Sequence, residues 1–476
     1  MFTTTAPIIQ QHELTSRCNN HCTFCYNPER CIEAFIPRTT DRNRNLEVVQ
    51  ISVERGVMAV CLTGGEPLLV GNHLFEVLKI YRDAGCYTSI NSNGRLITSV
   101  IAERLAQAEL RTALISIHGL DDLHDLMVGD TAFKETWRGI QNLRDQGIAV
   151  TPNFVATAKN VHGLMEIGLR LLQSGIASMA VTPFLPSWGA KGHEQFVLES
   201  QHYRDYFAVI KRLQQEGMQI DSTLPIPPCV LMKHCPESWE RYLSVLSPRV
   251  CMAGRSFGVV SPDGLFRACI QAPYLEFFGG SVFDQYEQSW KQANVWAESK
   301  MLLDDCLACA ALTICGGGCR TSSLWENKGS VAGKTMYMGE PLTEREAKPF
   351  IDRTVVPSPR LSPIYQWNSE VRLRDEGWGM IVFNPCNQSF TILSSEFGKM
   401  RFDHDQPLKI ASDKIASVLL AIGAVRRVDE DLDDVQLLDD SVIVLPGDHF
   451  LPRLTKGLDP SLVHCLRADT GERYFF

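Results

Sequence analysis

The sequence lacks any long uncharged apolar run, and no segment approaches the roughly 18 residues that a membrane-spanning helix needs. Its amino end, MFTTTAPIIQQHELTSRC, lacks the basic stretch and apolar core of a secretion signal. Dense runs of Lys and Arg are also missing: 46 basic residues face 55 acidic ones, for a net charge of -9. We therefore expect a cytoplasmic protein that binds neither membranes nor nucleic acid.

Charged residues make up only 21% of the chain and apolar residues 45%, a composition typical of globular proteins and not of disordered ones. At 476 residues the chain is about three times a typical domain, so we expect two or three cores. Cysteine, by contrast, is abundant, with 16 residues. In a large chain without a secretion signal, dense cysteine groups more often bind metal than form disulfides.

Residues 10–215 alternate apolar β-type runs with amphipathic helical stretches. The expected strands are Ile9–Leu14, Val57–Leu62, Tyr87–Asn91, Ala113–Ile117, Ala149–Ala156 and Met179–Phe184, and the expected helices lie near Leu46–Arg55, His73–Asp83, Thr98–Ala108, Phe133–Gln146, Val161–Gln173 and Gln195–Gln215. Six strand-then-helix units predict a parallel sheet, as a partial barrel or a doubly wound sheet. The loops after the first four strands should then share one site, because ligands gather at the carboxyl ends of such strands.

The rest of the chain changes character several times. A proline-rich connector is followed by a cysteine-rich region and then by a polar, proline-containing segment that reads as a linker. Beyond it, expected strands at Glu370–Asp375, Met380–Phe383, Ser389–Leu393 and Val425–Val428 and helices at Ser394–Met400 and Ser412–Ile422 have an order that resembles a winged helix. We therefore divide the chain into a barrel (1–215), a connector with a cysteine-rich domain (216–330), a linker (331–365) and a small α+β domain (366–476).

A first cysteine loop holds Cys18, Cys22 and Cys25 in the spacing C-x3-C-x2-C, with Phe24 just before the last. Three thiolates cannot saturate a four-iron cluster, so one iron stays open for another ligand. The alternatives are a structural zinc site completed by a histidine such as His21 or His12, or cysteines that merely pack.

The second informative loop is Thr63-Gly64-Gly65-Glu66-Pro67, which follows an apolar strand. Two glycines permit a sharp turn with exposed carbonyl groups, and an acidic residue beside them can bind a cation such as an α-ammonium group. Taken alone, the string also fits an ordinary turn.

Together the two loops resemble the radical S-adenosylmethionine (SAM) superfamily, whose enzymes are partial (β/α)6 barrels. The resemblance implies that Cys18, Cys22 and Cys25 hold a [4Fe-4S] cluster. It also implies that SAM contacts Gly64, Gly65, Glu66, Pro67, Asn93 and Ser116. Many members carry an arginine a dozen residues past that serine, where this chain has Leu126-Met127-Val128. The partner of the SAM carboxylate is therefore not apparent from the sequence.

The cysteine-rich region runs Cys251, Gly264, Cys269, and then Cys306-x2-Cys309-x5-Cys315-x3-Cys319. This order resembles the SPASM extension of radical SAM peptide-modifying enzymes, which implies one or two auxiliary iron–sulfur clusters. By that resemblance Cys251, Cys269 and Cys319 serve one cluster and Cys306, Cys309 and Cys315 the other, while the usual seventh cysteine is missing. A four-thiolate zinc ribbon is the alternative.

Two ligands remain to be found for these clusters. Cys235 or Cys229 could complete the first, and we favour Cys235; Cys386 or a non-thiolate group could complete the second. Cys31, Cys61 and Cys86 lack metal-binding spacing and are expected to pack in the barrel.

Polar residues after the fourth strand are candidates for proton transfer. His118 and Asp125 are the two catalytic candidates, with His124 beside them. Such residues also commonly satisfy loop backbone groups, which is the competing interpretation.

The function implied by these resemblances is reductive cleavage of SAM to a 5′-deoxyadenosyl radical and oxidation of a side chain, by crosslink, thioether or related bond, in a ribosomally synthesised peptide. The expected partners are a precursor peptide, whose leader residues 366–476 would bind as an added strand at Glu370–Asp375, and an electron donor such as flavodoxin or ferredoxin. A structural cap or a dimerisation role is the alternative for residues 366–476.

Two other functions compete. One is a radical SAM enzyme that acts on a small molecule or on a folded protein, as in cofactor biosynthesis or sulfatase maturation. The other is a non-catalytic, zinc-organised binding protein, which requires zinc at both cysteine groups.

Overall fold

The computed structural model of the chain describes residues 4–27, 41–187, 190–246, 250–272, 278–293, 296, 302–326, 337–352, 364–386, 388–394, 397, 408–410, 413–422, 424–427, 436–438, 464–467 and 473–475. Cys31 and most of the predicted helix Ser394–Met400 lie outside the described residues. None of the described helices is long and apolar enough to cross a bilayer.

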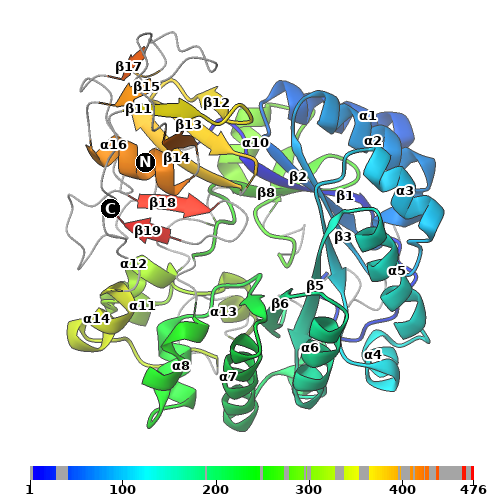
Figure 1. Ribbon diagram of the computed structural model, residues 1–476, viewed down its shortest axis with the longest axis vertical. Helices are drawn as coiled ribbons and strands as arrows, with labels where there is room; N and C mark the ends of the chain where they lie inside the picture. The colour runs from blue at the N-terminus through cyan, green and yellow to red at the C-terminus, as the bar shows by residue number, and fades with distance from the viewer. Residues whose placement is uncertain are drawn as a thin grey trace.

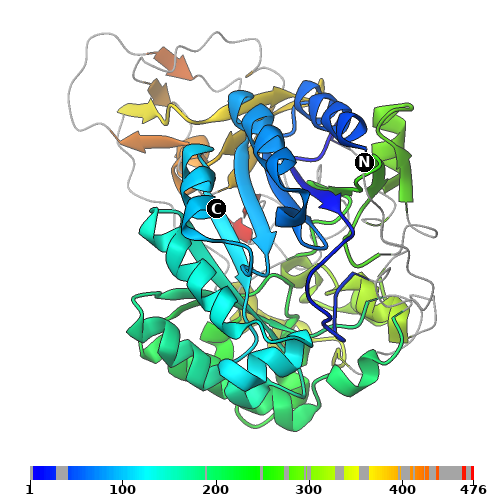
Figure 2. The same ribbon diagram turned by 90° about the vertical axis from the view of Figure 1, so that its right-hand side faces the viewer.

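The first half of the chain is a partial parallel barrel, as predicted. Its elements are β1 (Ile9–Thr15), α1 (Arg42–Glu54), β2 (Ala59–Gly64), α2 (Asn72–Asp83), β3 (Tyr87–Ser92), α3 (Ser99–Gln107), β4 (Thr112–Ser116), α4 (Asp121–Val128), α5 (Phe133–Asp145), β5 (Ala149–Ala156), α6 (Leu164–Gln173), β6 (Ser178–Pro183), α7 (Ser200–Gln215) and β7 (Gln219–Asp221). Strands β1 to β7 pair in sequence order, all parallel. The helices α1 to α6 cover the outside of the curved sheet (Figures 1 and 2).

Local sequence accounts for these elements. In α2 the side chains of Leu74, Val77, Leu78 and Tyr81 recur every three or four residues, and all four are buried. Strand β2 has few solvent-facing positions, as a strand covered on both faces requires. Helix α4 and the seventh strand, β7, escaped prediction, because the eight residues of α4 and the three of β7 carry too little periodicity.

The sheet continues beyond β1 into the cysteine-rich region. Strand β8 (Phe257–Val260) pairs parallel with β1, and β9 (Leu265–Arg267) and β10 (Phe278–Ser281) add antiparallel strands, giving ten strands in the order β10-β9-β8-β1-β2-β3-β4-β5-β6-β7. Helix α10 (Tyr286–Ala293) packs on β10. Strand β1 therefore has the second cysteine region on one side and the glycine loop on the other.

Short helices organise the remaining cysteines: α8 (Pro228–His234), α11 (Asp304–Ala308), α12 (Leu312–Cys315) and α13 (Arg320–Glu326). Part of the segment expected to be a linker forms helix α14 (Glu344–Asp352). Its Phe350 ring stacks on Trp239 of the connector, with centroids 5.4 Å apart. The two segments thus pack together with these helices (Figure 1).

The carboxyl-terminal region is α+β, as expected, but its described part contains two small sheets. One has the order β12-β13-β14-β18-β19 and the other β16-β11-β15-β17. Their elements are β11 (Ile364–Trp367), β12 (Arg372–Asp375), β13 (Gly379–Asn384), β14 (Ser389–Ser394), β15 (Leu408–Ile410), α16 (Asp413–Ala421), β16 (Val425–Arg427), β17 (Gln436–Leu438), β18 (His464–Arg467) and β19 (Arg473–Phe475). A core with Val382, Leu393 and Leu419 joins strands to α16.

Strand β12, which we expected to be a docking edge, is the end strand of its sheet, and two of its side chains contact the barrel. The guanidinium of Arg374 donates to the backbone carbonyls of Ala6, Pro7 and Gly56, which precede β1 and β2, at 2.8–3.1 Å. Arg372 donates to the carbonyl of Gly85, just before β3, at 2.8 Å. The carboxyl-terminal region is therefore attached to the barrel at the amino ends of the barrel strands.

Candidate active site

The loops predicted to share one site line a single cavity of about 780 Å³. Its wall includes the predicted residues Cys18, Cys22, Cys25, Gly64, Gly65, Asn93, Ser116 and His118, and also Cys251 and Cys269 of the cysteine-rich region. Gln11 of β1 and Asn153 of β5 line it too, and each has a buried side-chain oxygen without a hydrogen-bond partner among the described residues. Such oxygens are available for a bound polar ligand.

The first cysteine loop is held by an aromatic anchor. Phe24 is buried and packs edge-on against His118 at 5.0 Å and against Phe184 at 6.3 Å between centroids. The sulfur of Cys18 accepts the backbone N–H of Asn20 at 3.4 Å, a contact within the cysteine loop. An apolar residue directly before the third cysteine thus packs the loop against the cavity wall.

The two glycines serve a close approach between loops. The backbone N–H of Gly65 donates to the carbonyl of Thr15 at 2.6 Å, and that of Glu66 donates to the carbonyl of Arg17 at 2.7 Å. A Cβ atom on Gly64 would lie 2.1 Å from the Thr15 oxygen, and one on Gly65 2.0 Å from the Arg17 oxygen. Any side chain here would push the cysteine loop away from the end of β2.

Glu66 binds its own chain, and it and Pro67 are not among the described residues that line the cavity. Its carboxylate accepts the N–H groups of Leu68 and Asn93 and the hydroxyl of Ser92, at 2.8–3.1 Å. Burial raises the pKa of Glu66 to about 7, against the lowering effect of these hydrogen bonds. In this arrangement Glu66 joins the loop after β2 to the loop after β3.

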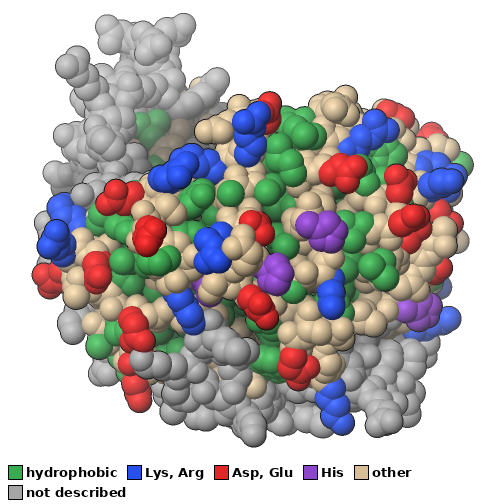
Figure 3. Space-filling model, turned by 90° about the horizontal axis from the view of Figure 1, so that it is seen from below, with side chains coloured by type: hydrophobic (Ala, Val, Ile, Leu, Met, Phe, Trp, Pro, Cys, Tyr) green, Lys and Arg blue, Asp and Glu red, His purple; other side chains and the backbone are tan. Residues whose placement is uncertain are grey.

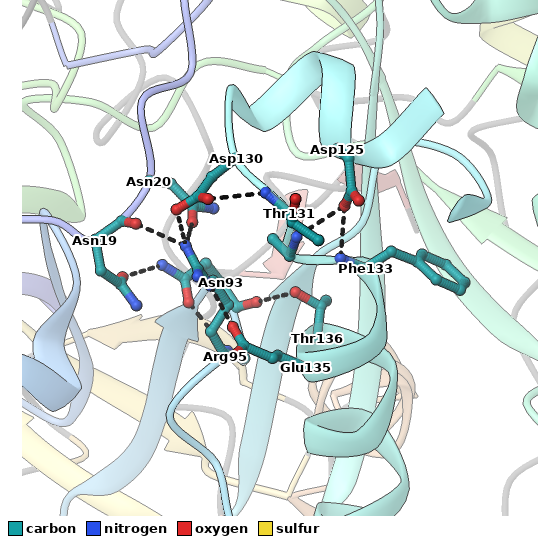
Figure 4. A network of polar contacts seen from close by, with 12 residues as sticks. Asn19, Asn20, Asn93, Arg95, Asp125, Asp130, Thr131, Phe133, Glu135 and Thr136 are labelled. Carbon is teal, nitrogen blue, oxygen red and sulfur yellow. Dashed lines mark hydrogen bonds and ion pairs between the residues drawn. The ribbon is translucent and has the colours of Figure 1, made fainter. Parts of the chain in front are cut away.

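A polar network around Arg95 ties the cysteine loop to the barrel (Figure 4). Its guanidinium donates to the carbonyl of Asn19 and the side chain of Asn20 in the cysteine loop, at 2.7 and 2.9 Å. On its other side it pairs with Asp130 and Glu135, each at 2.7 Å. Sequence reasoning missed Arg95, because only the fold brings these loops together.

Replacing Arg95 with methionine should loosen the cysteine loop. We expect a loss of about 1–3 kcal/mol of stability, since Asp130 and Glu135 are part-exposed and can recover water when their partner is removed. Iron bound by the first cysteine loop should fall as well. Thermal unfolding and iron analysis of anaerobic protein check this, with the exposed Arg104→Met as the matched control. Equal iron content in the two variants would contradict the role given to Arg95.

His118 is a neutral hydrogen-bond donor in this cavity. Its Nδ1 accepts the N–H of Val155 at 3.3 Å, which leaves the ring proton on Nε2. Burial, with a further contribution from His124, lowers the pKa of His118 to about 3. The Asp125 carboxylate accepts the backbone N–H groups of Ala132 and Phe133 at the start of α5. Asp125 is not among the described residues that line the cavity.

The second cysteine region forms two groups. Cys251, Cys269 and Cys319 are mutually close, so that negative charge on one adds to the effect of burial in raising the pKa of another, to about 11 for Cys269 and about 12 for Cys319. Cys306, Cys309 and Cys315 form the other group, and the thiol near them is Cys229.

For Cys235, which we favoured as a ligand, no thiol of either group is among the causes of its pKa shift. It is buried at the carboxyl end of α8, whereas Cys229 lies in the first turn of that helix, and the nearby charged group that affects its pKa is Arg204. Cys386 is exposed in the turn after β13, beside Asn368. Cys86 is buried as expected, but Cys61 faces the cavity.

Within the described part of the chain, no three His, Cys, Asp or Glu side chains converge on a point where one metal ion would bind. Thiolates around a single zinc ion lie at about 2.3 Å from it and so crowd together. Thiolates bound to different irons of one cluster stand further apart.

A buried ion pair connects the two cysteine regions. Arg267 of β9 and Glu13 of β1 lie 2.5 Å apart with side chains almost fully buried. Arg267 also donates to the carbonyls of Ile270 and Ala272, which flank the loop after Cys269. The pair thus links the strand that carries the first cysteine loop to the segment that carries Cys269.

Comparison with known proteins identifies the barrel. The family model described as the radical SAM superfamily matches residues 12–160, which include all three cysteines and the glycine loop. These residues form a radical SAM domain. Members of the superfamily use SAM and a [4Fe-4S] cluster, and the three thiols beside the cavity fit that cluster.

Solved structures share the fold of this chain. The structure of anSMEcpe with bound AdoMet matches with a TM-score of 0.54 at 16% sequence identity. The match covers 72% of this chain and 92% of the anSMEcpe chain. SuiB of Streptococcus suis bound to its precursor peptide SuiA has a TM-score of 0.54 at 17% identity and covers 71% of this chain and 75% of its own.

Relatives by sequence include heme synthases and peptide cyclases. An AdoMet-dependent heme synthase of Nitratidesulfovibrio vulgaris is 25% identical over 323 residues, which cover 65% of this chain and 86% of the relative. A PqqA peptide cyclase of Granulibacter bethesdensis is 24% identical over 341 residues, which cover 67% and 84%.

Proposed function

We propose that this radical SAM enzyme oxidises a side chain of a ribosomally synthesised peptide. The observation that carries the proposal is the chemistry of the cavity wall. Among the described lining residues there is no lysine or arginine, and the one acidic residue is Asp221. The remaining polar groups are mostly neutral hydroxyls and amides. Such a wall suits an uncharged or weakly polar side chain with its peptide groups.

The same wall is poorly suited to a substrate with several carboxylates. A tetrapyrrole of the kind that the heme synthase relatives are named for carries propionate groups, which proteins commonly bind with Arg or Lys. Desolvating those carboxylates against neutral donors alone would be costly. For the single carboxylate of SAM, we propose that neutral donors suffice, among them Ser116 and the Nε2–H of His118. These would take the place of the arginine that the sequence lacks.

The proposed roles follow from position. Cys18, Cys22 and Cys25 would hold the cluster, and Gly64, Gly65 and Asn93 would contact SAM from neighbouring loops. When bound, the cluster supplies one electron that cleaves SAM into methionine and a 5′-deoxyadenosyl radical. The protein's part is to hold SAM and the substrate together and to exclude water from the cavity.

The proposed oxidation requires an acceptor for the electron that the substrate radical loses. The radical removes one hydrogen atom from the substrate, and the substrate radical then loses one electron and one proton as the new bond forms. Auxiliary clusters at the two cysteine groups would accept that electron. Cys251 and Cys269 line the cavity, so a cluster that they hold would lie beside it. A flavodoxin or ferredoxin is the proposed donor of the first electron.

We propose that residues 366–476 contribute to peptide binding. The side chains of Arg372 and Arg374 attach β12 to the barrel. Cys386 and Gln388, from the turn after β13, line the cavity, so this region can contact a substrate directly. On the face shown in Figure 3, basic and acidic side chains are interspersed and form no basic patch, which is consistent with a partner other than nucleic acid.

A second candidate is oxidation of a small molecule such as a tetrapyrrole, favoured by the match to the heme synthases. The test is anaerobic incubation with SAM and a reductant, with either a peptide encoded beside the gene or Fe-coproporphyrin III. We expect the peptide to raise 5′-deoxyadenosine formation several-fold and to lose two hydrogen atoms by mass spectrometry. Stimulation by the porphyrin alone would overturn the peptide proposal in favour of this second candidate.

A further inference from the structure

Cys229 lies beside the cysteine loop at residues 306–319, far from it in sequence. A Cβ atom placed on Gly318 would lie 2.9 Å from the ring of Pro227, so the start of α8 touches this loop directly. Cys229 itself is buried in the first turn of α8. Helix α8 therefore places the Cys229 thiol beside the cysteine loop.

One extended segment contacts both Cys229 and the cysteine loop. The N–H of Leu342 donates to the sulfur of Cys309 at 3.2 Å. Three residues earlier, Gly339 packs so tightly on Cys229 that an added Cβ would lie 2.4 Å from its carbonyl oxygen. The Gly339 N–H also hydrogen-bonds the Cys229 thiol. Because three extended residues span only about 10 Å, this segment fixes the two thiols near each other.

The thiols also affect one another electrically. Cys306 lies close enough to Cys229 for a charge–charge interaction between the two groups, and this interaction is larger than the one between Cys306 and Cys309. Cys315 interacts in the same way with Cys306 and with Cys229. Four cysteine side chains gathered in one pocket are a ligand set for a metal centre, which binds cysteine as the thiolate.

A buried cation completes this arrangement. Arg320, next to Cys319, is 2% exposed, and its three guanidinium nitrogens have no hydrogen-bond partner among the described residues. Its charge is felt at Cys306. An unpaired buried guanidinium is costly, and it implies a neighbouring anion. A four-iron cluster with four thiolates is such an anion and carries sulfide acceptors as well.

We propose that Cys229, Cys306, Cys309 and Cys315 together hold one auxiliary four-iron cluster, with Arg320 as the cation beside it. Cys229 then replaces, from upstream in the chain, the seventh cysteine that this sequence lacks. The inference rests on the proposed auxiliary clusters but not on the identity of the substrate. In the other group, the cysteines that interact with Cys269 and Cys319 are members of the group itself, Cys251 and Cys269.

The test compares Cys229→Ser with Cys235→Ser, two buried cysteines of the same helix region. Both changes are made in the full chain carrying Cys18, Cys22 and Cys25→Ala, so that only auxiliary iron is counted. After anaerobic reconstitution, Cys229→Ser should lose about four irons, or convert one cluster to a three-iron form visible by electron paramagnetic resonance (EPR). Cys235→Ser should keep the parent's iron, sulfide and spectrum.

Two results would overturn the assignment: full iron with an unchanged spectrum in Cys229→Ser, or stoichiometric zinc in place of iron in the parent. Because the counts need no substrate, failure of the peptide chemistry would leave them unaffected.

Arg320 gives an independent test if Cys229→Ser fails to fold. Arg320→Gln should keep the iron but make one auxiliary cluster harder to reduce, since a positive charge beside a cluster favours its reduced state. Arg320→Lys should restore most of the potential. Unchanged auxiliary potentials in Arg320→Gln would contradict a cluster beside this arginine.

Discussion

Replacement of Cys18, Cys22 and Cys25 together by alanine is expected to remove about four irons per chain and to abolish formation of 5′-deoxyadenosine. All three residues line the cavity, and they lie on the loop after β1 that contacts the glycine loop after β2. No other described cysteine near them could substitute with the same loop geometry, since Cys61 lies on β2 itself. Iron, sulfide and 5′-deoxyadenosine are measured on anaerobically purified protein.

The matched control for this triple variant is Cys386→Ser. Cys386 is an exposed cysteine in the carboxyl-terminal region, and its loss should leave the iron count unchanged. The iron that remains in the triple variant should belong to the auxiliary groups. If the triple variant kept its full iron, or continued to cleave SAM, the assignment of the first cysteine loop would be wrong.

Replacement of Arg267 by methionine is the second change with a large expected effect. It should lower the free energy of unfolding by about 3–5 kcal/mol. The change leaves the carboxylate of Glu13 buried without its cation and removes the donors to Ile270 and Ala272. Strand β1 and the loop after Cys269 should then separate. We expect a fall of several degrees in the thermal midpoint of the loaded enzyme and loss of iron from the Cys251, Cys269 and Cys319 group.

A double variant distinguishes the ion pair from simple packing. Adding Glu13→Gln to Arg267→Met removes the unpaired buried charge, so the double variant should be more stable than Arg267→Met alone. An exposed pair serves as the control: Arg212→Met, which breaks its contact with Glu216, should change the midpoint little. An Arg267→Met enzyme as stable as this control would refute the role of the buried pair.

The barrel was predictable because its signals are local. Each strand of residues 10–215 is a short apolar run, and each outer helix repeats its buried residues every three or four positions, as in α2. The cysteine loop and the glycine loop were predictable for a related reason, since both follow strands and parallel strands bring their carboxyl ends together.

The rest depends on contacts between distant segments. Nothing in the spacing of Cys229 indicates that α8 packs beside residues 306–319, and from sequence alone we favoured Cys235, at the other end of that helix. The pairing of β8 with β1 has no local signal either, because β8 to β10 are only three or four residues long. Arg95 and Arg267 act only through partners that the fold brings to them.

The most direct measurement of the central claim is the EPR spectrum of the reduced, anaerobic enzyme with and without SAM. The account predicts that SAM changes the signal of one cluster, because the first cysteine loop supplies three thiolates and leaves one iron for SAM, and that this change disappears when Cys18, Cys22 and Cys25 are replaced. A spectrum that SAM leaves unaltered, in enzyme shown to contain the cluster, would contradict it.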